Sequence, residues 1–426
     1  MNIEALYQVY QQFPSVQTDT RLLKENDLFF ALKGPNFNAN QFAQKAVDAG
    51  AARVVIDEAS YAIPGKTILC DDVLTTLQAL AKFHRSQFDI PFLAITGSNG
   101  KTTTKELVHV VLSEKYRTYT TQGNLNNHIG IPLTILRIGK DAEMAVIEMG
   151  ANHQREIAGY CEYAMPTHGL ITNCGKAHLE GFGGIEGVRK GKGELFDYLR
   201  AHGGSAFVMW DYDYLQDMSK GIPEIIKYGT RQSDTTGMID ASEPFLSVTM
   251  DNGSGPFAIH SHLVGGYNLP NLMAASAIGH YFGVTDALIQ SAIESYQPSN
   301  SRSQLLTRGT NQVILDAYNA NPSSMKLAIE NLARLSHENK ILLLGGMAEL
   351  GPESMPEHQD IVSLIGQYPW KEVVLVGGDF LKFDHPYKKF ATSADAAQWF
   401  RQQNFQNAYI LIKGSRSMQM EKILQP

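Results

Sequence analysis

The feature that most constrains the fold is an apolar run that leads into a glycine turn and then a helical pattern, "FLAITGSNGKTTTKEL" at residues 92–107. Residues 92–96 predict a buried strand, and a helix is predicted to begin near Thr103. Glycines in such a turn let several backbone N–H groups face one anion, and the helix start favours negative charge. The sequence therefore predicts a phosphate-binding loop formed by Gly97, Ser98, Asn99, Gly100, Lys101, Thr102 and Thr103.

This loop differs from the common pattern G-x-x-x-x-G-K-[ST], because Ile95 stands where the first glycine belongs. A plain strand-to-helix turn is the alternative interpretation. If the loop binds a nucleotide, Lys101 reaches the β- and γ-phosphates and the Thr102 hydroxyl ligates Mg²⁺.

Apolar strands followed by turns and helices recur along the chain, which predicts an α/β protein with mostly parallel sheets. In the middle stretch these strands are "FLAIT", "EMAVIEMG" and "HGLIT", and the pattern restarts with "NQVILDAY", "KILLLGGM", "EVVLVGG" and "NAYILIKGS". The stretch "SYQPSNSRSQ" separates the two parts. We predict three domains, at residues 1–86, 87–299 and 300–426.

Composition excludes several classes of protein. The apolar fraction of 43% and charged fraction of 19% are typical of a globular chain, and the formal charge of −7 argues against nucleic acid as a partner. No apolar run approaches the ~18 residues that cross a bilayer, and the first twenty residues do not read as a signal peptide. Cys70, Cys161 and Cys174 form no CxxC pair, so we expect buried, reduced thiols. A cytoplasmic protein without membrane insertion is predicted.

The phosphate loop resembles that of the Mur ligases, whose version reads G-[ST]-N-G-K-T. Further segments resemble that family in the same order, namely "TQGNLNNHIGIPLTIL", "VIEMGANHQREI", "TNCGKAHLEGFG" and "GKGELF". Three more resemble the member that adds D-alanyl-D-alanine to the peptidoglycan precursor, namely "LDAYNANPSSM", "GGMAELGPES" and "KGSRSMQME". The resemblance runs from about residue 18 to 422.

The resemblance implies a small N-terminal UDP-binding α/β domain, a central P-loop ATPase domain and a C-terminal Rossmann-like α/β domain. The implied activity is that of an ATP-dependent amide ligase, which forms an acyl phosphate on UDP-N-acetylmuramoyl-tripeptide and joins it to D-alanyl-D-alanine. ATP and two Mg²⁺ ions are the implied cofactors, and we expect a monomer. The residues implied to act in the reaction are Lys101, His178, Lys192 and Arg302.

The implied metal ligands are Thr102, Glu148, His178 and Lys192. Carboxylate oxygen suits Mg²⁺, and ligands collect at the carboxyl ends of parallel strands, where Glu148 and His178 are predicted to lie. In many Mur ligases the lysine matching Lys192 carries a carbamate that helps to hold the second ion. Each residue also has a simpler interpretation: a strand-end carboxylate in water, a surface histidine, and an exposed lysine on an amphipathic helix.

Other residues are implied as nucleotide or substrate contacts. Asn271 corresponds to a family asparagine near the adenine, Arg302 to an arginine that reaches the γ-phosphate, and Asp316 to the residue near the ribose. Ser301 replaces the glycine that precedes the arginine in the family, and Tyr267 replaces a histidine. Without the resemblance these residues would be ordinary surface or helix-cap positions. The implied substrate contacts are Thr20, Asn126, Asn127, Tyr318, Asn319 and Asn321.

Two other enzymes remain open, a sister ligase that adds a single amino acid and a folylpolyglutamate-type ligase with the same loop. A nucleotide-switched interaction protein is disfavoured because the chain has no N-K-x-D element. A simple kinase would not need a whole first domain beside its ATP site.

Overall fold

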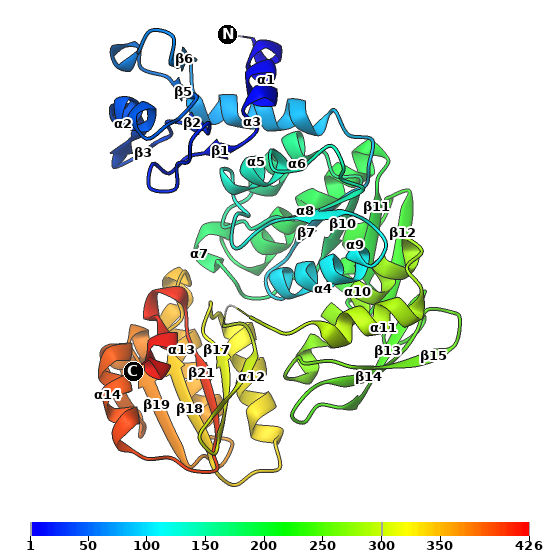
Figure 1. Ribbon diagram of the computed structural model, residues 1–426. Helices are drawn as coiled ribbons and strands as arrows, with labels where there is room; N and C mark the ends of the chain where they lie inside the picture. The colour runs from blue at the N-terminus through cyan, green and yellow to red at the C-terminus, as the bar shows by residue number, and fades with distance from the viewer. Residues whose placement is uncertain (1, 300, 426) are drawn as a thin grey trace.

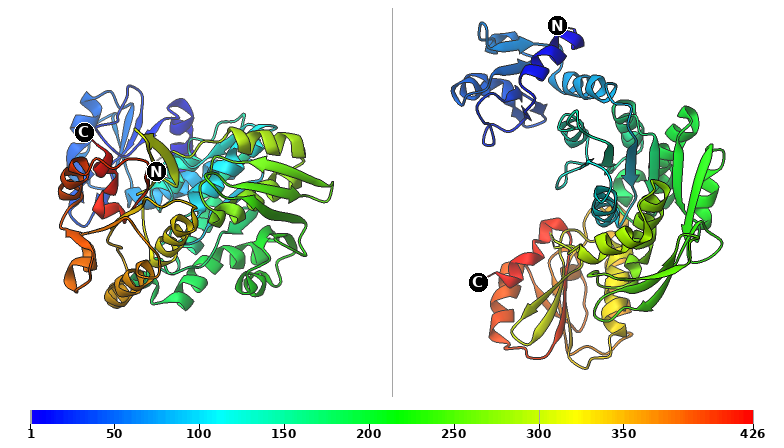
Figure 2. Two further views of the ribbon diagram at one scale, coloured as in Figure 1. Left: turned by 90° about the horizontal axis from the view of Figure 1, so that it is seen from below. Right: turned by 45° about the vertical axis from the view of Figure 1, so that its right-hand side comes forward.

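The computed structural model describes residues 2–299 and 301–425, which form three larger sheets with their helices and a separate two-stranded hairpin (Figure 1). The order of elements along the chain confirms the predicted α/β class with three domains. The N-terminal and C-terminal domains lie at opposite ends of the central one (Figures 1 and 2). Residue 300, the first of the predicted last domain, lies outside the described residues, and the boundaries at 86/87 and 299/300 stay a proposal.

The N-terminal domain is built on a parallel sheet in the order β1-β2-β5-β6. Its strands are short, so helices supply much of the burial. The elements are α1 (Ile3–Gln12), β1 (Val16–Gln17), β2 (Leu28–Phe30), the hairpin β3 (Lys33–Gly34) and β4 (Phe37–Asn38), α2 (Ala43–Asp48), β5 (Arg53–Ile56), β6 (Thr67–Leu69) and α3 (Val73–Arg85).

Helix α3 joins the first domain to the second, because it packs on α1 and β2 and also on α5 and α6 of the central domain. It begins at the N-cap Asp72, whose side chain accepts a hydrogen bond from Thr75 N. At its end, Arg85 donates to the backbone oxygens of Ala164 and Met165 in the central domain. These contacts anchor the first domain on the second.

The central domain contains a nine-stranded sheet in the order β15-β14-β13-β12-β11-β10-β7-β9-β8. The strands are β7 (Phe92–Thr96), β8 (Thr118–Thr120), β9 (Met144–Glu148), β10 (His168–Ile171), β11 (Ser205–Met209), β12 (Glu224–Gly229), β13 (Thr235–Ala241), β14 (Ser247–Asp251) and β15 (Pro256–His260). The helices are α4 (Lys101–Ser113), α5 (Gly130–Ile135), α6 (Glu156–Ala164), α7 (Leu179–Phe182), α8 (Ile185–His202), α9 (Asp213–Ser219), α10 (Leu269–Tyr281) and α11 (Asp286–Ser295).

Neighbouring strands pair in parallel from β8 across the sheet to β13, which confirms the mostly parallel sheet. Beyond β13 the strands β14 and β15 pair antiparallel, and this extension of the sheet was not predicted. Pairing of Ile95 with Glu148 and of Thr96 with Ile171 brings three strand ends to one edge. The phosphate loop, Glu148 and the segment after β10 therefore meet there.

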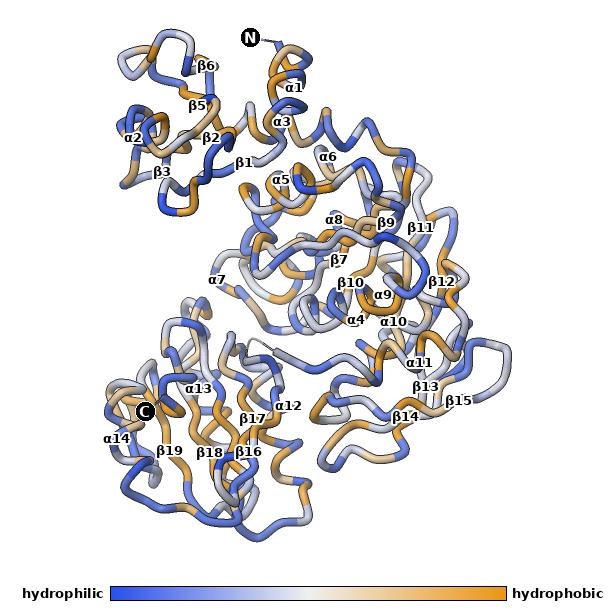
Figure 3. Tube along the Cα trace, in the orientation of Figure 1, coloured by the Kyte–Doolittle hydropathy of each residue, from blue (hydrophilic) through white to orange (hydrophobic). Residues whose placement is uncertain are grey.

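The C-terminal domain has a six-stranded sheet in the order β16-β17-β21-β18-β19-β20, parallel except for the first pair. Its elements are β16 (Gln304–Arg308), β17 (Asn311–Asp316), α12 (Pro322–Arg334), β18 (Lys340–Gly345), α13 (Ser354–Ile365), β19 (Glu372–Val376), β20 (Lys388–Phe390), α14 (Ser393–Gln402) and β21 (Tyr409–Lys413). The middle strands are buried and form the hydrophobic core between the helices (Figure 3). The four predicted strands are confirmed as β17, β18, β19 and β21.

The burial of the cysteines differs in part from the prediction. Cys161 and Cys174 are buried and all three thiols are free, but Cys70 is only half-buried, because its strand segment lies near the edge of the small first sheet. Among the described residues, no helix combines the length and the apolar character that a membrane span requires.

Candidate active site

A cavity of about 890 Å³ lies between the central and C-terminal domains. Of the predicted site residues, those that line it are Ser98, Asn99, Gly100, Lys101, Thr102, Thr103, Asn126, Asn127, Glu148, His178, Asn271, Arg302, Asp316, Tyr318, Asn319 and Asn321. Gly97 and Lys192 lie beside the lining, since Gly97 is next to Ser98 and Lys192 bonds the lining residue Ala151. Thr20 is in the N-terminal domain and does not line this cavity.

The phosphate loop has a backbone that only glycine fits at two positions. Gly97 has φ +142° and Gly100 has φ +81°. A Cβ atom at Gly97 would lie 2.0 Å from Thr172 Oγ1, and one at Gly100 would lie 2.6 Å from Asn271 Oδ1. The helix α4 begins at Lys101 rather than near Thr103, because Gly100 already turns the chain into it. Its first N–H groups lack intrahelical acceptors and face the cavity.

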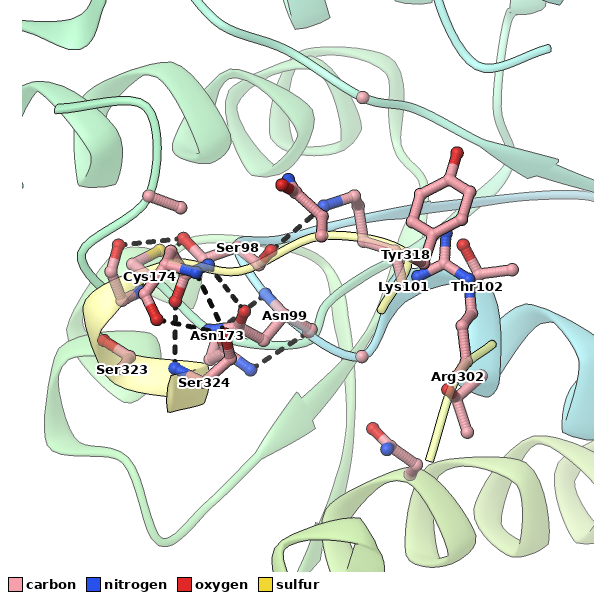
Figure 4. Close-up of a pocket in the computed structure, with 18 of the residues that line it drawn as sticks. Ser98, Asn99, Lys101, Thr102, Asn173, Cys174, Arg302, Tyr318, Ser323 and Ser324 are labelled. Atoms are coloured by element: carbon pink, nitrogen blue, oxygen red, sulfur yellow. Dashed lines mark hydrogen bonds between the residues drawn. The ribbon is translucent and has the colours of Figure 1, made fainter. Parts of the chain in front are cut away.

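The loop is braced by the segment that follows β10. Asn99 N donates to Asn173 Oδ1 at 3.1 Å, and the Asn99 carbonyl accepts from Thr172 Oγ1 at 2.6 Å. Ser98 N donates to Asn173 O at 2.9 Å. Asn173 was not among the residues predicted for the site, although it follows a buried strand at the edge where ligands collect. Figure 4 shows this bonded cluster on one side of the pocket.

The ammonium of Lys101 lies on its own loop, where Nζ donates to Gly97 O at 2.6 Å and to Ser98 O at 3.2 Å. Burial lowers the pKa of Lys101 to about 8, Glu148 opposes that change, and the nearby Arg302 charge adds to it. The side chain is therefore mostly charged at neutral pH.

Glu148 carries a buried carboxylate with one free oxygen. The residue is 1% exposed, and its Oε1 accepts from Thr102 Oγ1 at 3.1 Å and from Asn126 Nδ2 at 2.8 Å. Its Oε2 is buried and has no hydrogen-bond partner among the described residues. A buried, unpaired carboxylate oxygen is costly, so this atom fits the position of a hard cation beside the Thr102 hydroxyl.

The described residues contain no group of three or more His, Cys, Asp or Glu side chains that could hold a metal by themselves. The Thr102 hydroxyl and the Glu148 carboxylate, as a pair, fit Mg²⁺, which usually takes one or two carboxylates together with phosphate oxygens. They do not fit a self-contained zinc or calcium site.

Lys192 is buried in α8, which rules out the exposed-lysine interpretation. The residue is 1% exposed, and its Nζ donates to Ala151 O at 3.0 Å and lies 5.0 Å from the centroid of the Phe182 ring. Burial and, to a smaller extent, the nearby Lys101 charge lower the pKa of Lys192 to about 7. A neutral lysine amine near pH 7 is nucleophilic, as addition to CO₂ would require.

His178 links the two domains in this structure. The residue has a left-handed backbone, with φ +52°, and its Nδ1 contacts the carboxylate of Glu349 from the C-terminal domain. This contact lowers the pKa of Glu349. Glu349 lies in the quoted "GGMAELG" segment, but nothing in the sequence indicated its partner. Lys176 nearby forms a second bridge, to Glu357 in α13 at 2.5 Å.

The C-terminal domain contributes to the cavity an ion pair between a buried lysine and a half-buried aspartate. Lys413, 2% exposed at the end of β21, contacts Asp316 at the end of β17 at 2.5 Å, and it also donates to Asn319 O at 3.3 Å. Lys413 was not among the residues predicted for the site. Its position at the end of an apolar strand, in "ILIKGS", was the available signal.

Asn271, predicted near the adenine, is held within the central domain. Its Oδ1 accepts from Thr104 Oγ1 at 3.0 Å, and its Nδ2 donates to Asn268 Oδ1 at 2.8 Å. These bonds tie α10 to α4 just behind the phosphate loop, which fixes the cavity wall there.

Asn321 bonds both to its own helix and to the phosphate loop. Its Oδ1 accepts from Ser324 N at 2.9 Å as the N-cap of α12, and its Nδ2 donates to Asn99 Oδ1 at 2.7 Å across the domain boundary. Asn321→Ala is expected to lower the free energy of unfolding by about 1 kcal/mol, because the cap is lost. Asn321→Asp is expected to keep the cap but lose the donor to Asn99.

Urea unfolding of both variants checks this prediction. If the Asp variant loses as much stability as the Ala variant, the bond to Asn99 rather than the cap carries the stabilisation. Equal stability of all three chains would contradict both parts.

Comparisons with known proteins agree with this geometry. The family model described as Mur ligase middle domain matches residues 95–279, and that described as Mur ligase, glutamate ligase domain matches residues 301–416. The chain is 34% identical over 423 residues to the UDP-N-acetylmuramoyl-tripeptide–D-alanyl-D-alanine ligase of Bacillus subtilis, covering 96% of this chain and 92% of the relative.

Solved structures share the fold over nearly the whole chain. A MurF structure from Acinetobacter baumannii superposes with a TM-score of 0.88 at 29% identity and covers 98% of this chain and 97% of the other. MurF from Thermotoga maritima, solved in complex with ADP, has a TM-score of 0.86 at 24% identity, covers 96% of each chain, and is a likeness of fold.

Proposed function

This chain belongs to the Mur ligase family, and on that premise we propose how its residues work. It is a ligase that joins D-alanyl-D-alanine to UDP-N-acetylmuramoyl-tripeptide with the consumption of ATP, which builds a peptidoglycan precursor. The relatives that match nearly the whole chain carry this activity in their names, so neither a sister ligase nor a folylpolyglutamate-type ligase is favoured.

The observation that carries the proposal is the cavity between the two larger domains. A phosphate loop with two obligatory glycines forms one wall, and residues of the C-terminal domain form the other. A ligase needs such a place, where the nucleotide, the acid and the amine meet away from water. Use of ATP is supported further by the ADP bound to the Thermotoga relative.

In the proposed reaction, the terminal carboxylate of the tripeptide attacks the γ-phosphorus of ATP, which gives an acyl phosphate and ADP. The amine of D-alanyl-D-alanine then attacks the acyl carbon, phosphate leaves, and the amine gives up a proton. No side chain is assigned as the base. Bonds across the domain boundary, such as that from Asn321 to Asn99, would keep the two domains together and exclude water from the acyl phosphate.

Lys101 and the N-terminus of α4 would hold the β- and γ-phosphates, and Arg302 would reach the γ-phosphate from the linker into the last domain. Asn271 and Asp316 would contact the adenosine. We propose Asn126, Asn127, Asn319 and Asn321 as contacts of the substrates at the cavity, and Thr20 as a contact of the UDP group in the first domain.

Thr102 and Glu148 would hold one Mg²⁺, and His178 with a carbamate on Lys192 would hold a second. Bound there, the ions would neutralise negative charge on the phosphates. The free Glu148 Oε2 supports the first assignment, and the buried amine of Lys192 supports the second. Carbamate formation would join the neutral amine to CO₂ and release one proton.

Glu148→Gln is expected to reduce ligation activity roughly 100-fold and to raise the Mg²⁺ concentration needed for half-maximal rate, because a neutral amide is a weaker metal ligand. Without Mg²⁺ the same variant is expected to unfold at a higher temperature, since a buried negative charge with one oxygen lacking a hydrogen-bond partner among the described residues is replaced by a neutral amide. Titration of the rate with Mg²⁺ and thermal unfolding in EDTA provide the two measurements.

Glu162→Gln is the matched control, because that carboxylate is 71% exposed on α6. An unchanged Mg²⁺ requirement in the Glu148 variant would remove this residue from the metal site.

The overall function is tested by phosphate release from ATP in the presence of Mg²⁺, the UDP-linked tripeptide and D-alanyl-D-alanine, with mass spectrometry of the product. Release that depends on the dipeptide and yields the pentapeptide is expected. Release with a single amino acid in place of the dipeptide would overturn the choice of amine substrate. Cytoplasmic location and a monomeric state remain part of the proposal.

A further inference from the structure

Arg302 lies over an aromatic ring, and among the described residues its guanidinium has no hydrogen-bond or ion-pair partner. Its Cζ is 3.6 Å from the centroid of the Tyr318 ring, and both residues line the cavity beside Lys101 and Thr102 (Figure 4). In residues 2–299 and 301–425, no hydrogen bond or ion pair from a protein group holds this guanidinium. Its five N–H donors are therefore free for a ligand.

Arg85 shows what an arginine with a purely structural role looks like in the same chain. It also stacks on an aromatic ring, with Cζ 3.7 Å from the Phe92 centroid. Its guanidinium donates, however, to the backbone oxygens of Ala164, Phe88 and Met165. In Arg85 all three guanidinium nitrogens donate hydrogen bonds to the protein, whereas among the described residues the guanidinium nitrogens of Arg302 donate none.

The backbone on both sides of Arg302 is fixed to the segment that carries Tyr318. Tyr318 N donates to Ser301 O at 3.2 Å, and Ser303 N donates to Asp316 Oδ1 at 3.1 Å. Ser301 and Ser303 have φ of +56° and +46°, in the left-handed region that favours glycine. This strain explains why a glycine suits the position of Ser301, and it indicates that the linker is held in one conformation.

The central domain holds the same linker from the other side, because the hydroxyls of Tyr267 and Ser303 are 3.1 Å apart. Arg302 therefore stays at the junction of the two domains. Its charge also acts on Lys101, since burial first and then Arg302 lower the pKa of that lysine while Glu148 opposes them. Two cations converge here on one region of the cavity, as a polyanion would require.

We propose that Tyr318 is a positioning residue, whose ring holds the Arg302 guanidinium ready for the terminal phosphate of a nucleoside triphosphate. A long side chain loses much conformational entropy when it is ordered on binding. Stacking on the ring already orders Arg302 before the nucleotide binds, so binding itself costs less entropy. ADP lacks the terminal phosphate, so Tyr318 makes the chain discriminate between triphosphate and diphosphate. This inference rests on the proposed function, and it moves Tyr318 from substrate contact to support of Arg302.

Calorimetric binding of ADP and of β,γ-methylene-ATP, each with Mg²⁺, tests the inference. Tyr318→Leu is expected to weaken binding of the triphosphate analogue about tenfold and to leave ADP binding within about twofold. Tyr318→Phe keeps the ring face and is expected to restore the discrimination. In an Arg302→Gln background, Tyr318→Leu is expected to cost almost nothing further, because the group that it positions is gone.

The inference would be overturned if the Leu variant bound both nucleotides more weakly by the same factor, or if it bound neither more weakly. Additive losses of triphosphate affinity in the double variant would overturn it as well. Thermal unfolding shows whether the variant is folded, and Tyr318→Met replaces it if it is not. Failure of the unsubstituted chain to bind either nucleotide would overturn both this inference and the proposed function. Intact discrimination without ligation would overturn the proposed function alone.

Discussion

Lys101→Ala is expected to lower kcat/KM for ligation about 10³-fold while the chain stays folded. The ammonium is the cation placed by the phosphate loop, and loss of one preorganised charge at a reacting phosphate has an effect of this order. Among the described residues, Lys101 donates only to Gly97 O and Ser98 O in its own loop, so its removal should cost about 1 kcal/mol of stability or less. Steady-state kinetics and urea unfolding measure the two quantities.

Lys326→Ala is a suitable control, since its ammonium is on α12, is 61% exposed and forms only a loose pair with Glu330. A loss smaller than tenfold in the Lys101 variant would mean that this lysine does not contact the phosphates.

The Lys101 variant should also differ in its response to pH. In the unsubstituted free enzyme the ammonium loses its proton as pH rises through about 8, so triphosphate affinity should fall above that value. The alanine variant should lack the part of this fall that is centred near pH 8, because the ammonium that titrates there is absent. Binding of the triphosphate analogue between pH 6.5 and 9 compares the two chains.

Lys192→Met is expected to abolish at least 99% of the ligation activity and yet to stabilise the chain by roughly 2 kcal/mol at pH 6. Methionine fills a similar volume, cannot form a carbamate, and removes an ammonium that is buried at 1% exposure. One bond to Ala151 O is lost, which offsets part of the gain. Activity assays and urea unfolding in EDTA without nucleotide test both parts.

The stability gain should depend on pH in a definite direction. The folded-state pKa of Lys192 is lowered to about 7, whereas an unfolded lysine titrates near 10.4. Between these values the unfolded chain binds more protons, so the stability of the unsubstituted chain rises with pH. The advantage of the methionine variant should therefore be largest below pH 7 and shrink towards pH 10.

Lys190→Met is the matched control, because Lys190 is exposed two residues earlier on α8. It should gain no stability. A destabilised Lys192 variant would show that the buried amine stabilises the fold, and an active one would show that the second metal site does not need it.

The sequence determined much of the central site, because those features are local. A buried strand, two glycines with positive φ and a helix start lie within twelve residues, so the phosphate loop could be predicted without tertiary contacts. Glu148 could be predicted at the same edge because it ends a buried strand, and the ends of neighbouring parallel strands meet. The four apolar strands of the last domain were recognisable for a similar reason, since buried parallel strands are apolar along their whole length.

Other features were decided by packing between distant segments. The burial of Lys192 depends on what covers α8, and residues 189–192 show only a basic helix. The arm of β13, β14 and β15 was missed because its strands are half-exposed and lack a continuous apolar run. The contacts of His178 with Glu349, Asn99 with Asn321 and Asp316 with Lys413 join residues 97 to 222 positions apart.

The first two contacts depend on how the last domain docks on the central one, the third depends on the pairing of β17 with β21, and no local pattern records that geometry. The sequence by itself determined which chemical groups the chain carries and at which strand ends they stand. Only the tertiary structure decided which of them are desolvated and which pair across the domain boundary. It also decided that the Arg302 guanidinium lies on the Tyr318 ring, with no partner for its donors in the part of the chain that the structure describes. The physical reason is that burial and pairing are properties of a three-dimensional environment, whereas glycine turns and apolar periodicity are properties of adjacent residues.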